Sequence, residues 1–468
     1  MWITLDTESN LPLKRQLYNK IKEMMLEGSL IANEKLPSTR VLARELCVSR
    51  NTILEVYDQL IAEGYLEGHH GSGTVVAAGV QLRLKVSYSK STCAPLIHKA
   101  ENENVIDFRS GIPDLELFPR KEWAKLYYHV CNDLPAATLR YCQAAGVLEL
   151  RNAISQYLYR TRGISCAPNN IMIVSGSTQG LSLISKLLYS DKQEVIVEDP
   201  IHHGLLNVIS SVGYKIKGVQ ADDNGLNTSL LEPSNHTSFI YTTPSHQYPL
   251  GSILPIQRRL SLIQYSLENE CFIVEDDYDS EFRFEGQPIN SLYELNPDKV
   301  IYLGSFSKIL APAIRLGFIL LPNELLAKYK TLKKYSDVHT EAISQYVLAE
   351  FIQNGGLEKH IWKMKKLYNQ KREHLLHELK SNFTGEFEIK GQAAGLHVLV
   401  HFSKVFFTEK LLEQIYAKNI KIYPVENFAL QSFGNHKNEI ILGYAHLSFS
   451  EITKGIQVLR DIIPKTLD

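Results

Sequence analysis

The stretch IVEDDYDSEF (Ile273 to Phe282), followed by GSFSKILAPAIRLG (Gly304 to Gly317), decides the fold of the larger part of this 468-residue chain. An apolar run typical of a buried strand, CFIVED or VIYLGS, enters each stretch and ends on polar residues. Loops at the carboxyl ends of parallel strands line the ligand crevice of open α/β sheets. Asp276, at the end of the first run, and Lys308, just after the second, are therefore predicted to face one cleft.

Similar apolar runs recur between residues 105 and 325, where IMIVSG, EVIVEDP, SFIYTTP and GFILLP alternate with helical stretches. This alternation is typical of the α/β class with a mainly parallel sheet. From about residue 326 the pattern changes to long amphipathic helices, followed by short strands near 387–402 and 439–445. The sequence thus predicts a large α/β part (about 105–325) and a smaller α+β C-terminal subdomain (about 326–468).

The polar residues at these strand ends match the chemical needs of pyridoxal phosphate (PLP). This cofactor takes a lysine as Schiff-base partner, an acid facing its pyridine nitrogen and a cradle for its phosphate. Lys308 and Asp276 supply the first two, and Tyr278 is expected to bond the ring hydroxyl. The segment SGSTQG (Ser175 to Gly180) opens a helix, so its N–H groups can approach an anion. Further donors of the kind that bind phosphate surround the lysine, namely Ser305, Ser307 and Arg315.

Each of these features has an ordinary alternative. A lysine in a polar loop is usually solvated, an aspartate after a strand is often a cap, and a Gly/Ser turn is usually only a turn. Their order at successive strand ends is what favours the PLP interpretation.

A second pattern, LPSTRVLARELCVSRNTILEVYDQLIAEGYLEGHHGSGTVV (Leu36 to Val76), predicts a winged helix-turn-helix near the N-terminus. An amphipathic helix over residues 12–27 precedes it, and Ser38 and Ser49 are expected to cap two further helices. Residues 65–66 and 74–76 predict the two strands of a wing. Apolar residues at helical spacing are expected to form the core of this head: Val41, Leu42 and Leu46 from one helix, and Ile53, Val56, Tyr57, Leu60 and Ile61 from the next.

Basic and short polar side chains gather at the starts of those two helices. Such helix ends offer free N–H groups to phosphates, and arginine pairs bidentately with guanine. The alternative is a small helical cap with solvated arginines, and the first 78 residues hold slightly more acidic than basic side chains. The predicted DNA contacts are Ser38, Thr39, Arg40, Ser49, Arg50, Asn51 and Thr52, with His70 and Gly71 at the wing tip entering a minor groove.

These motifs together resemble a known family. The head resembles the GntR-type winged helix-turn-helix, and residues 105–468 resemble the aspartate-aminotransferase fold, fold type I of the PLP enzymes. With TTPSHQYPLG (Thr242 to Gly251) and IVEDDYDSEF, nearly the whole chain resembles the MocR/GabR family of bacterial regulators. The resemblance implies a DNA-binding domain over 1–78, a linker over 79–104 and a PLP-binding effector domain over 105–468.

The resemblance also implies roles for individual residues. Lys308 would form the internal aldimine, Asp276 would face the pyridine nitrogen, and Tyr278 would bond the ring oxygen. His202 occupies the ring-stacking position, and Tyr141 would reach the neighbour's phosphate site in a head-to-tail homodimer. The phosphate itself would be held by Ser177, Thr178, Ser305, Ser307 and Arg315.

The chain departs from the family pattern where aminotransferases hold a substrate carboxylate. The C-terminal arginine position reads ILGYA (Ile441 to Ala445), so Ile441 replaces the arginine. Two arginines of the GABA-responsive relative are also missing, because those regions read IHHG (201–204) and IYPVENFAL (422–430). The resemblance therefore does not support GABA as effector. The missing arginines also weaken the hypothesis that the chain transaminates ordinary α-amino acids. The polar residues available as substitutes, each more plausible as a loop or core residue, are His202, His203, Asn427 and His446.

Composition sets further bounds. The net charge of -1 and the pI near 7.0 do not indicate nucleic-acid binding by bulk charge. Six cysteines without a CxxC pair predict reduced thiols, with no disulfide frame and no metal site. The start MWITLDTESN lacks the apolar core of a signal peptide, and no apolar run reaches the roughly 18 residues of a membrane helix. We therefore expect a cytoplasmic protein that does not contact membranes.

The leading hypothesis is a PLP-dependent transcriptional regulator that binds double-stranded operator DNA as a dimer. Either PLP is itself the signal, or an amino compound that reacts at Lys308 is the effector. The missing arginines favour PLP or an unusual amine slightly. The alternative hypothesis is a functional PLP-dependent aminotransferase that carries a DNA-binding head, and turnover of an amino donor with a keto acid would separate the two.

Overall fold

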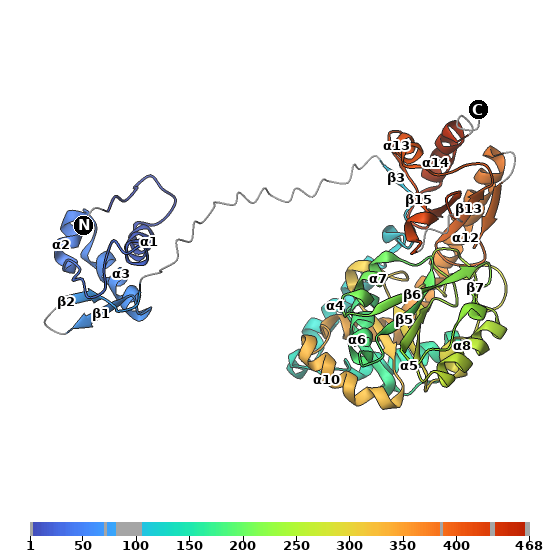
Figure 1. The fold of residues 1–468 in the computed structure, drawn as a ribbon, viewed down its shortest axis with the longest axis horizontal. Helices are drawn as coiled ribbons and strands as arrows, with labels where there is room; N and C mark the ends of the chain where they lie inside the picture. Colours follow the sequence, from blue (N-terminus) through green and yellow to red (C-terminus); the bar gives the residue numbers. More distant parts are fainter. Residues whose placement is uncertain (1–2, 70–72, 81–104, 384–386, 431–435, 464–468) are drawn as a thin grey trace. The chain divides into compact units, whose positions relative to one another are not determined.

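The structure is a computed structural model that describes residues 3–69, 73–80, 105–383, 387–430 and 436–463. The chain divides into two compact units, Met1–Lys99 and Ala100–Asp468, which we treat separately (Figure 1). Most of the predicted linker, together with His70 and Gly71, lies outside the described residues.

The N-terminal unit is a winged helix-turn-helix. Ser38 Oγ accepts a hydrogen bond from the N–H of Val41, and Ser49 Oγ accepts one from the N–H of Thr52, so both predicted caps form. The wing is an antiparallel pair in which Leu66 lies opposite Val76. The elements are α1 (Leu13–Leu26), α2 (Thr39–Glu45), α3 (Arg50–Ala62), β1 (Leu66–His69) and β2 (Gly73–Val76).

The core of this unit follows the predicted helical spacing with two exceptions. Leu42 and most of the expected residues of α3 are buried. Val41 and Ile61 are each 37% exposed, so their prediction as core residues was wrong. Successive residues of an α-helix are turned by about 100°. The buried Leu42 and Leu60 therefore rotate their sequence neighbours Val41 and Ile61 out of the core.

An eight-stranded mixed sheet forms the centre of the second unit, in the order β4-β11-β10-β9-β8-β5-β6-β7. The pairs β10–β9, β9–β8, β8–β5 and β5–β6 are parallel, whereas β11 and β7 run antiparallel to their neighbours. All six predicted strands form. The strands are β4 (Ile171–Val174), β5 (Glu194–Asp199), β6 (Lys215–Asp222), β7 (Gly225–Leu226), β8 (Thr237–Thr242), β9 (Phe272–Asp277), β10 (Val300–Ser305) and β11 (Gly317–Leu320).

Both faces of this sheet are covered by helices (Figure 1). In β4, Ile171 and Ile173 join one apolar cluster, while Met172 and Val174 join another. Alternate residues of a strand point to opposite faces, so the two clusters lie on the two sides of the sheet. The helices of the large part are α4 (Arg120–Asp133), α5 (Leu148–Arg162), α6 (Ser177–Leu188), α7 (His203–Ser210), α8 (Ile256–Glu268), α9 (Leu292–Leu295), α10 (Leu326–Asp337) and α11 (Ile343–Gln353).

A smaller antiparallel sheet, in the order β12-β13-β16-β15, forms the C-terminal subdomain. A two-residue strand near the start of the unit, β3 (Ile106–Asp107), pairs with β14 (Ile420–Lys421), so the segment after β3 begins beside this subdomain. No helix in the described ranges is long and apolar enough to cross a membrane. The other elements are α12 (Gly356–Asn382), β12 (Phe387–Lys390), β13 (His397–Phe402), α13 (Glu409–Tyr416), β15 (Tyr423–Pro424), β16 (Glu439–Gly443) and α14 (Phe449–Ile462).

Candidate functional site

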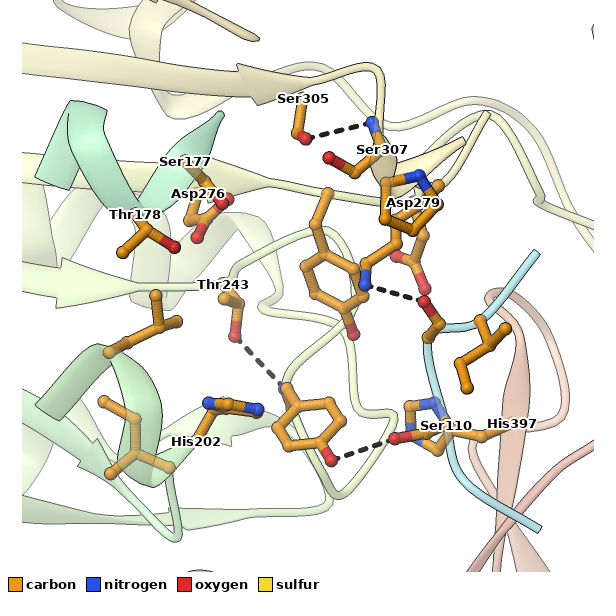
Figure 2. Close-up of a pocket in the computed structure, with 18 of the residues that line it drawn as sticks. Ser110, Ser177, Thr178, His202, Thr243, Asp276, Asp279, Ser305, Ser307 and His397 are labelled. Carbon is orange, nitrogen blue, oxygen red and sulfur yellow. Dashed lines mark hydrogen bonds between the residues drawn. The ribbon is translucent and has the colours of Figure 1, made fainter. Parts of the chain in front are cut away.

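A cavity of about 500 Å³ lies where the central strands of the large sheet end. It is lined from the loops and helix starts that follow β4, β5, β8, β9 and β10, which is the edge that the sequence predicts. Figure 2 shows several of these side chains directed toward a common space. The predicted cofactor residues that line it are Ser177, Thr178, His202, Asp276, Tyr278, Ser305, Ser307, Lys308 and Arg315.

Lys308 lies just beyond the end of β10, with its ammonium group inside the cavity. Its Nζ donates a 2.6 Å hydrogen bond to the carbonyl of Gly111. Burial lowers the pKa of Lys308, against the opposing effect of the carboxylates of Asp279 and Asp276. A lowered pKa increases the neutral fraction of an amine, which is the form that attacks a carbonyl.

Asp276 lies near the end of β9 and is buried. Its Oδ2 accepts a 2.6 Å hydrogen bond from the hydroxyl of Tyr241, whereas Oδ1 is buried with no hydrogen-bond partner among the described residues. Burial raises the pKa of Asp276 to about 7. A buried carboxylate oxygen that lacks a partner is costly, so this site fits a ligand that brings a charged N–H donor.

The part of the cavity at the start of α6 suits an anion. Helix α6 begins after Gly176 with no side-chain cap, so the backbone N–H groups of its first turn are offered to a ligand. Arg315 lies against this turn and donates a 2.6 Å hydrogen bond to the carbonyl of Ser175. Gly176 has φ +86°, and a Cβ there would lie 2.6 Å from Nη2 of Arg315. Glycine is therefore needed for this arginine to approach the turn.

Two residues that were predicted to contact the cofactor ring also make hydrogen bonds within the chain that the sequence did not indicate. The hydroxyl of Tyr278 donates a 3.0 Å hydrogen bond to the carbonyl of His246. His202 caps α7, with Nδ1 accepting from the N–H of Gly204 at 3.0 Å. Burial, together with the nearby charge of Lys308, lowers the pKa of His202. A neutral imidazole is the form suited to stacking on a cationic aromatic ring.

Several cavity residues were missed by sequence reasoning. Glu198, at the end of β5, accepts hydrogen bonds from the hydroxyls of Thr242 and Thr243 at 2.6 and 2.7 Å. The sequence feature that could have identified Glu198 is the EDP that ends the apolar run EVIVEDP. Other missed residues approach from the segment after β3 and from the C-terminal subdomain, far apart in sequence: Arg109, Ser110, Gly111, His397, Tyr423 and Phe428.

The residues considered for binding a substrate carboxylate differ in whether they line the cavity. Ile441 is fully buried in an apolar cluster with Leu399 and Val425, and it does not line the cavity. His446 is half-buried, with Nε2 2.8 Å from the carbonyl of Asp107. Of the four predicted polar substitutes, His202 lines the cavity, whereas His203, Asn427 and His446 do not.

Tyr141 lies outside the cavity of its own chain. Its side chain is 85% exposed, and its ring contacts His339 with a centroid distance of 5.9 Å. The single chain therefore leaves this tyrosine available to another molecule.

In the N-terminal unit the predicted DNA contacts gather at two helix starts. Arg40 lies in the first turn of α2 and Arg50 opens α3, and both are exposed, as is Asn51. Thr39 and Thr52 are half-buried. The hydroxyls of Ser38 and Ser49 are engaged in the helix caps.

Comparison with known proteins identifies both units. The model of the aminotransferase class I and II family matches residues 103–439, and that of the bacterial regulatory proteins of the gntR family matches residues 13–76. An uncharacterized HTH-type transcriptional regulator of Bacillus subtilis, YdeL, is 34% identical over 97% of this chain and 98% of its own. The probable rhizopine catabolism regulatory protein MocR of Rhizobium meliloti is 31% identical over 98% of this chain and 95% of its own.

A solved structure supports the same conclusion for the second unit. Kynurenine aminotransferase of Pyrococcus horikoshii, in complex with PMP, superposes with a TM-score of 0.72 and 27% identity, covering 79% of this chain and 93% of its own. The chain belongs to the aminotransferase class I and II family. More narrowly, it is one of the HTH-type transcriptional regulators that join such a domain to a gntR-type head.

Proposed function

We propose that this regulator binds PLP covalently at Lys308 and operator DNA through its N-terminal unit, and that occupancy of the cavity controls DNA binding. The observation that carries the proposal is the buried, unpartnered Oδ1 of Asp276 in the same cavity as Lys308. When bound, PLP supplies an electrophilic carbon and an aromatic ring that withdraws electrons.

The residues of the chain would divide the work of holding this group. Asp276 would pair with the protonated pyridine nitrogen, and His202 would stack on the ring. The first turn of α6, with Ser177 and Thr178, would hold the phosphate together with Arg315. Ser305 and Ser307 line the same cavity and would add hydroxyl donors.

The proposal extends to the assembly. The DNA-binding surface would be the exposed starts of α2 and α3, and a dimer would present two such surfaces to an operator with two half-sites. In a head-to-tail homodimer, Tyr141 of each chain would reach the phosphate of the neighbour. Its 85% exposure supports a role outside its own chain. We place this regulator in the cytoplasm, where operator DNA lies.

Operator affinity tests the proposal directly. We expect the full-length protein, assayed by fluorescence anisotropy on an operator selected in vitro, to change its affinity several-fold when PLP is added, or when an amino compound is added to the PLP-loaded protein. An operator affinity that is the same without PLP, with PLP and with every amine tested would refute control by the cavity.

A further inference from the structure

Three cationic side chains among the described residues line the cavity, and the proposed function gives two of them a role in holding PLP. Lys308 and Arg315 serve the covalent bond and the phosphate, whereas Arg109 lines the cavity from the segment that follows β3. In Figure 2, Ser110, the next residue in the chain, lies with His397 on the side of the cavity away from Ser177 and Thr178.

Arg109 is held in position by residues of two elements. Its Nε donates a 3.1 Å hydrogen bond to the hydroxyl of Tyr423 and lies 3.7 Å from Oδ2 of Asp107. The Tyr423 hydroxyl in turn donates to the same Oδ2 at 3.2 Å. A guanidinium carries five N–H donors in a planar fork, and this is the geometry that recognises a carboxylate in proteins.

A ligand carboxylate would need a cation from another segment, because position 441 does not supply one. The family pattern puts an arginine at this position, and the chain has a buried isoleucine instead. Tyr423 of β15 lies directly opposite Ile441 of β16 in the small sheet. Through its hydrogen bond to Tyr423, Arg109 therefore contacts the strand pair β15–β16, where the family pattern places its arginine.

The chain segment that carries Arg109 also contacts the reactive lysine. Gly111, whose carbonyl accepts the hydrogen bond from Nζ of Lys308, is only two residues from Arg109. Two residues of extended chain span about 7 Å at most. Lys308 and Arg109 line the same cavity of about 500 Å³, so a ligand with an amine at Lys308 and a carboxylate at Arg109 is a small molecule. The carboxylates of Asp276 and Asp279 line the cavity near Lys308, which favours the amine there and the anion at Arg109.

Aromatic rings form the wall beside this end of the cavity. The ring centroids of Tyr248 and Phe428 are 5.4 Å apart, and the hydroxyl of Tyr248 lies 2.9 Å from Oγ of Ser110. Ile201 and Leu205 line the same cavity. The wall is thus suited to an apolar or aromatic side chain.

We infer that Arg109 anchors the carboxylate of the effector, and that the effector is an amino acid with an apolar or aromatic side chain rather than a simple amine. This inference rests on the proposed function, because it requires PLP at Lys308. It makes Arg109 a residue that determines specificity, with Tyr423 as its positioning residue.

Matched pairs of probes test the assignment. The PLP-loaded full-length protein is titrated with L- and D-phenylalanine against 2-phenylethylamine, and with L- and D-alanine against ethylamine, while the visible absorbance band of bound PLP is followed. We expect at least one acid to change the band at a concentration at least tenfold lower than its amine. Arg109→Gln should remove this preference and leave the response to the amine within twofold, which also shows that the variant is folded.

Two further variants complete the design. Arg109→Lys keeps the charge without the bidentate fork and should give an intermediate preference. Arg120→Gln removes an exposed arginine of α4 that does not line the cavity, and it should behave as the wild type. The inference is overturned if wild type responds to acids no better than to amines, if no acid changes the band, or if Arg109→Gln retains the preference. Failure of PLP to give any band would instead refute the proposed function itself.

Discussion

The hydroxyl of Tyr241 donates a 2.6 Å hydrogen bond to Oδ2 of Asp276, and Oδ1 of the same carboxylate is buried with no partner among the described residues. Tyr241 thus fixes the orientation of the carboxylate and leaves the second oxygen for a ligand. This pairing is the feature that best fits the pyridine nitrogen of PLP.

Replacing Asp276 with asparagine tests this fit. The amide oxygen can still accept from Tyr241, but the side chain cannot carry the negative charge that stabilises a protonated pyridine nitrogen. We expect Asp276→Asn to raise the Kd for PLP about tenfold or more, which corresponds to about 1.4 kcal/mol. An absorbance titration measures it, with Asp298→Asn as an exposed control outside the cavity. If both variants bound PLP with the same affinity, Asp276 would not be a cofactor-binding residue.

The same carboxylate predicts a pH dependence of stability in the PLP-free protein. Burial raises the pKa of Asp276 to about 7, whereas an aspartate in an unfolded chain titrates near about 3.9. Between these values the folded state binds more protons than the unfolded state, so the free energy of unfolding falls as the pH rises.

Asparagine does not titrate, so Asp276→Asn removes this contribution. The melting temperature of the PLP-free variant should fall less steeply than that of the wild type between pH 5 and 7. Burial also raises the pKa of Glu281 to about 7, and this residue gives a background common to both proteins. If the melting temperatures of the two proteins changed equally with pH across this range, the assignment of a raised pKa to Asp276 would be contradicted.

Gly176, at the start of α6, and Gly163, at the C-terminal end of α5, form a matched pair of test positions. Both have positive φ, +86° and +69°, but a Cβ at Gly176 would lie 2.6 Å from Arg315, whereas one at Gly163 has nothing within 4 Å. Alanine at either position should cost about 1 kcal/mol or more of stability because of the backbone strain. We expect only Gly176→Ala to weaken PLP binding as well, by about tenfold in a titration. An equal effect of Gly163→Ala would show that the loss is general.

Arg50 opens the helix α3 and is exposed. If it reads a base edge, Arg50→Ala should weaken operator binding by about 1–3 kcal/mol in an anisotropy assay at fixed salt. Lys20→Ala removes an exposed charge from α1 and serves as control. Unchanged affinity of the Arg50 variant would mean that another element enters the groove.

Local sequence signals predicted most of the fold. The six apolar runs became strands because their side chains are buried, and Asp276 and Lys308 could be found because they follow such runs. Strand β6 was missed because KIKGVQAD mixes charged and apolar residues and is only partly buried. The Arg109–Tyr423 pair, 314 residues apart in the chain, has no local signal, because tertiary packing alone brings the two together.

Covalent attachment of PLP to Lys308 is the central claim, and the visible absorbance spectrum tests it most directly. Wild-type protein titrated with PLP should develop the absorbance band of a lysine-bound cofactor, and Lys308→Ala should not, although its N-terminal unit should still bind DNA. A variant that develops the same band as wild type would contradict the assignment of Lys308.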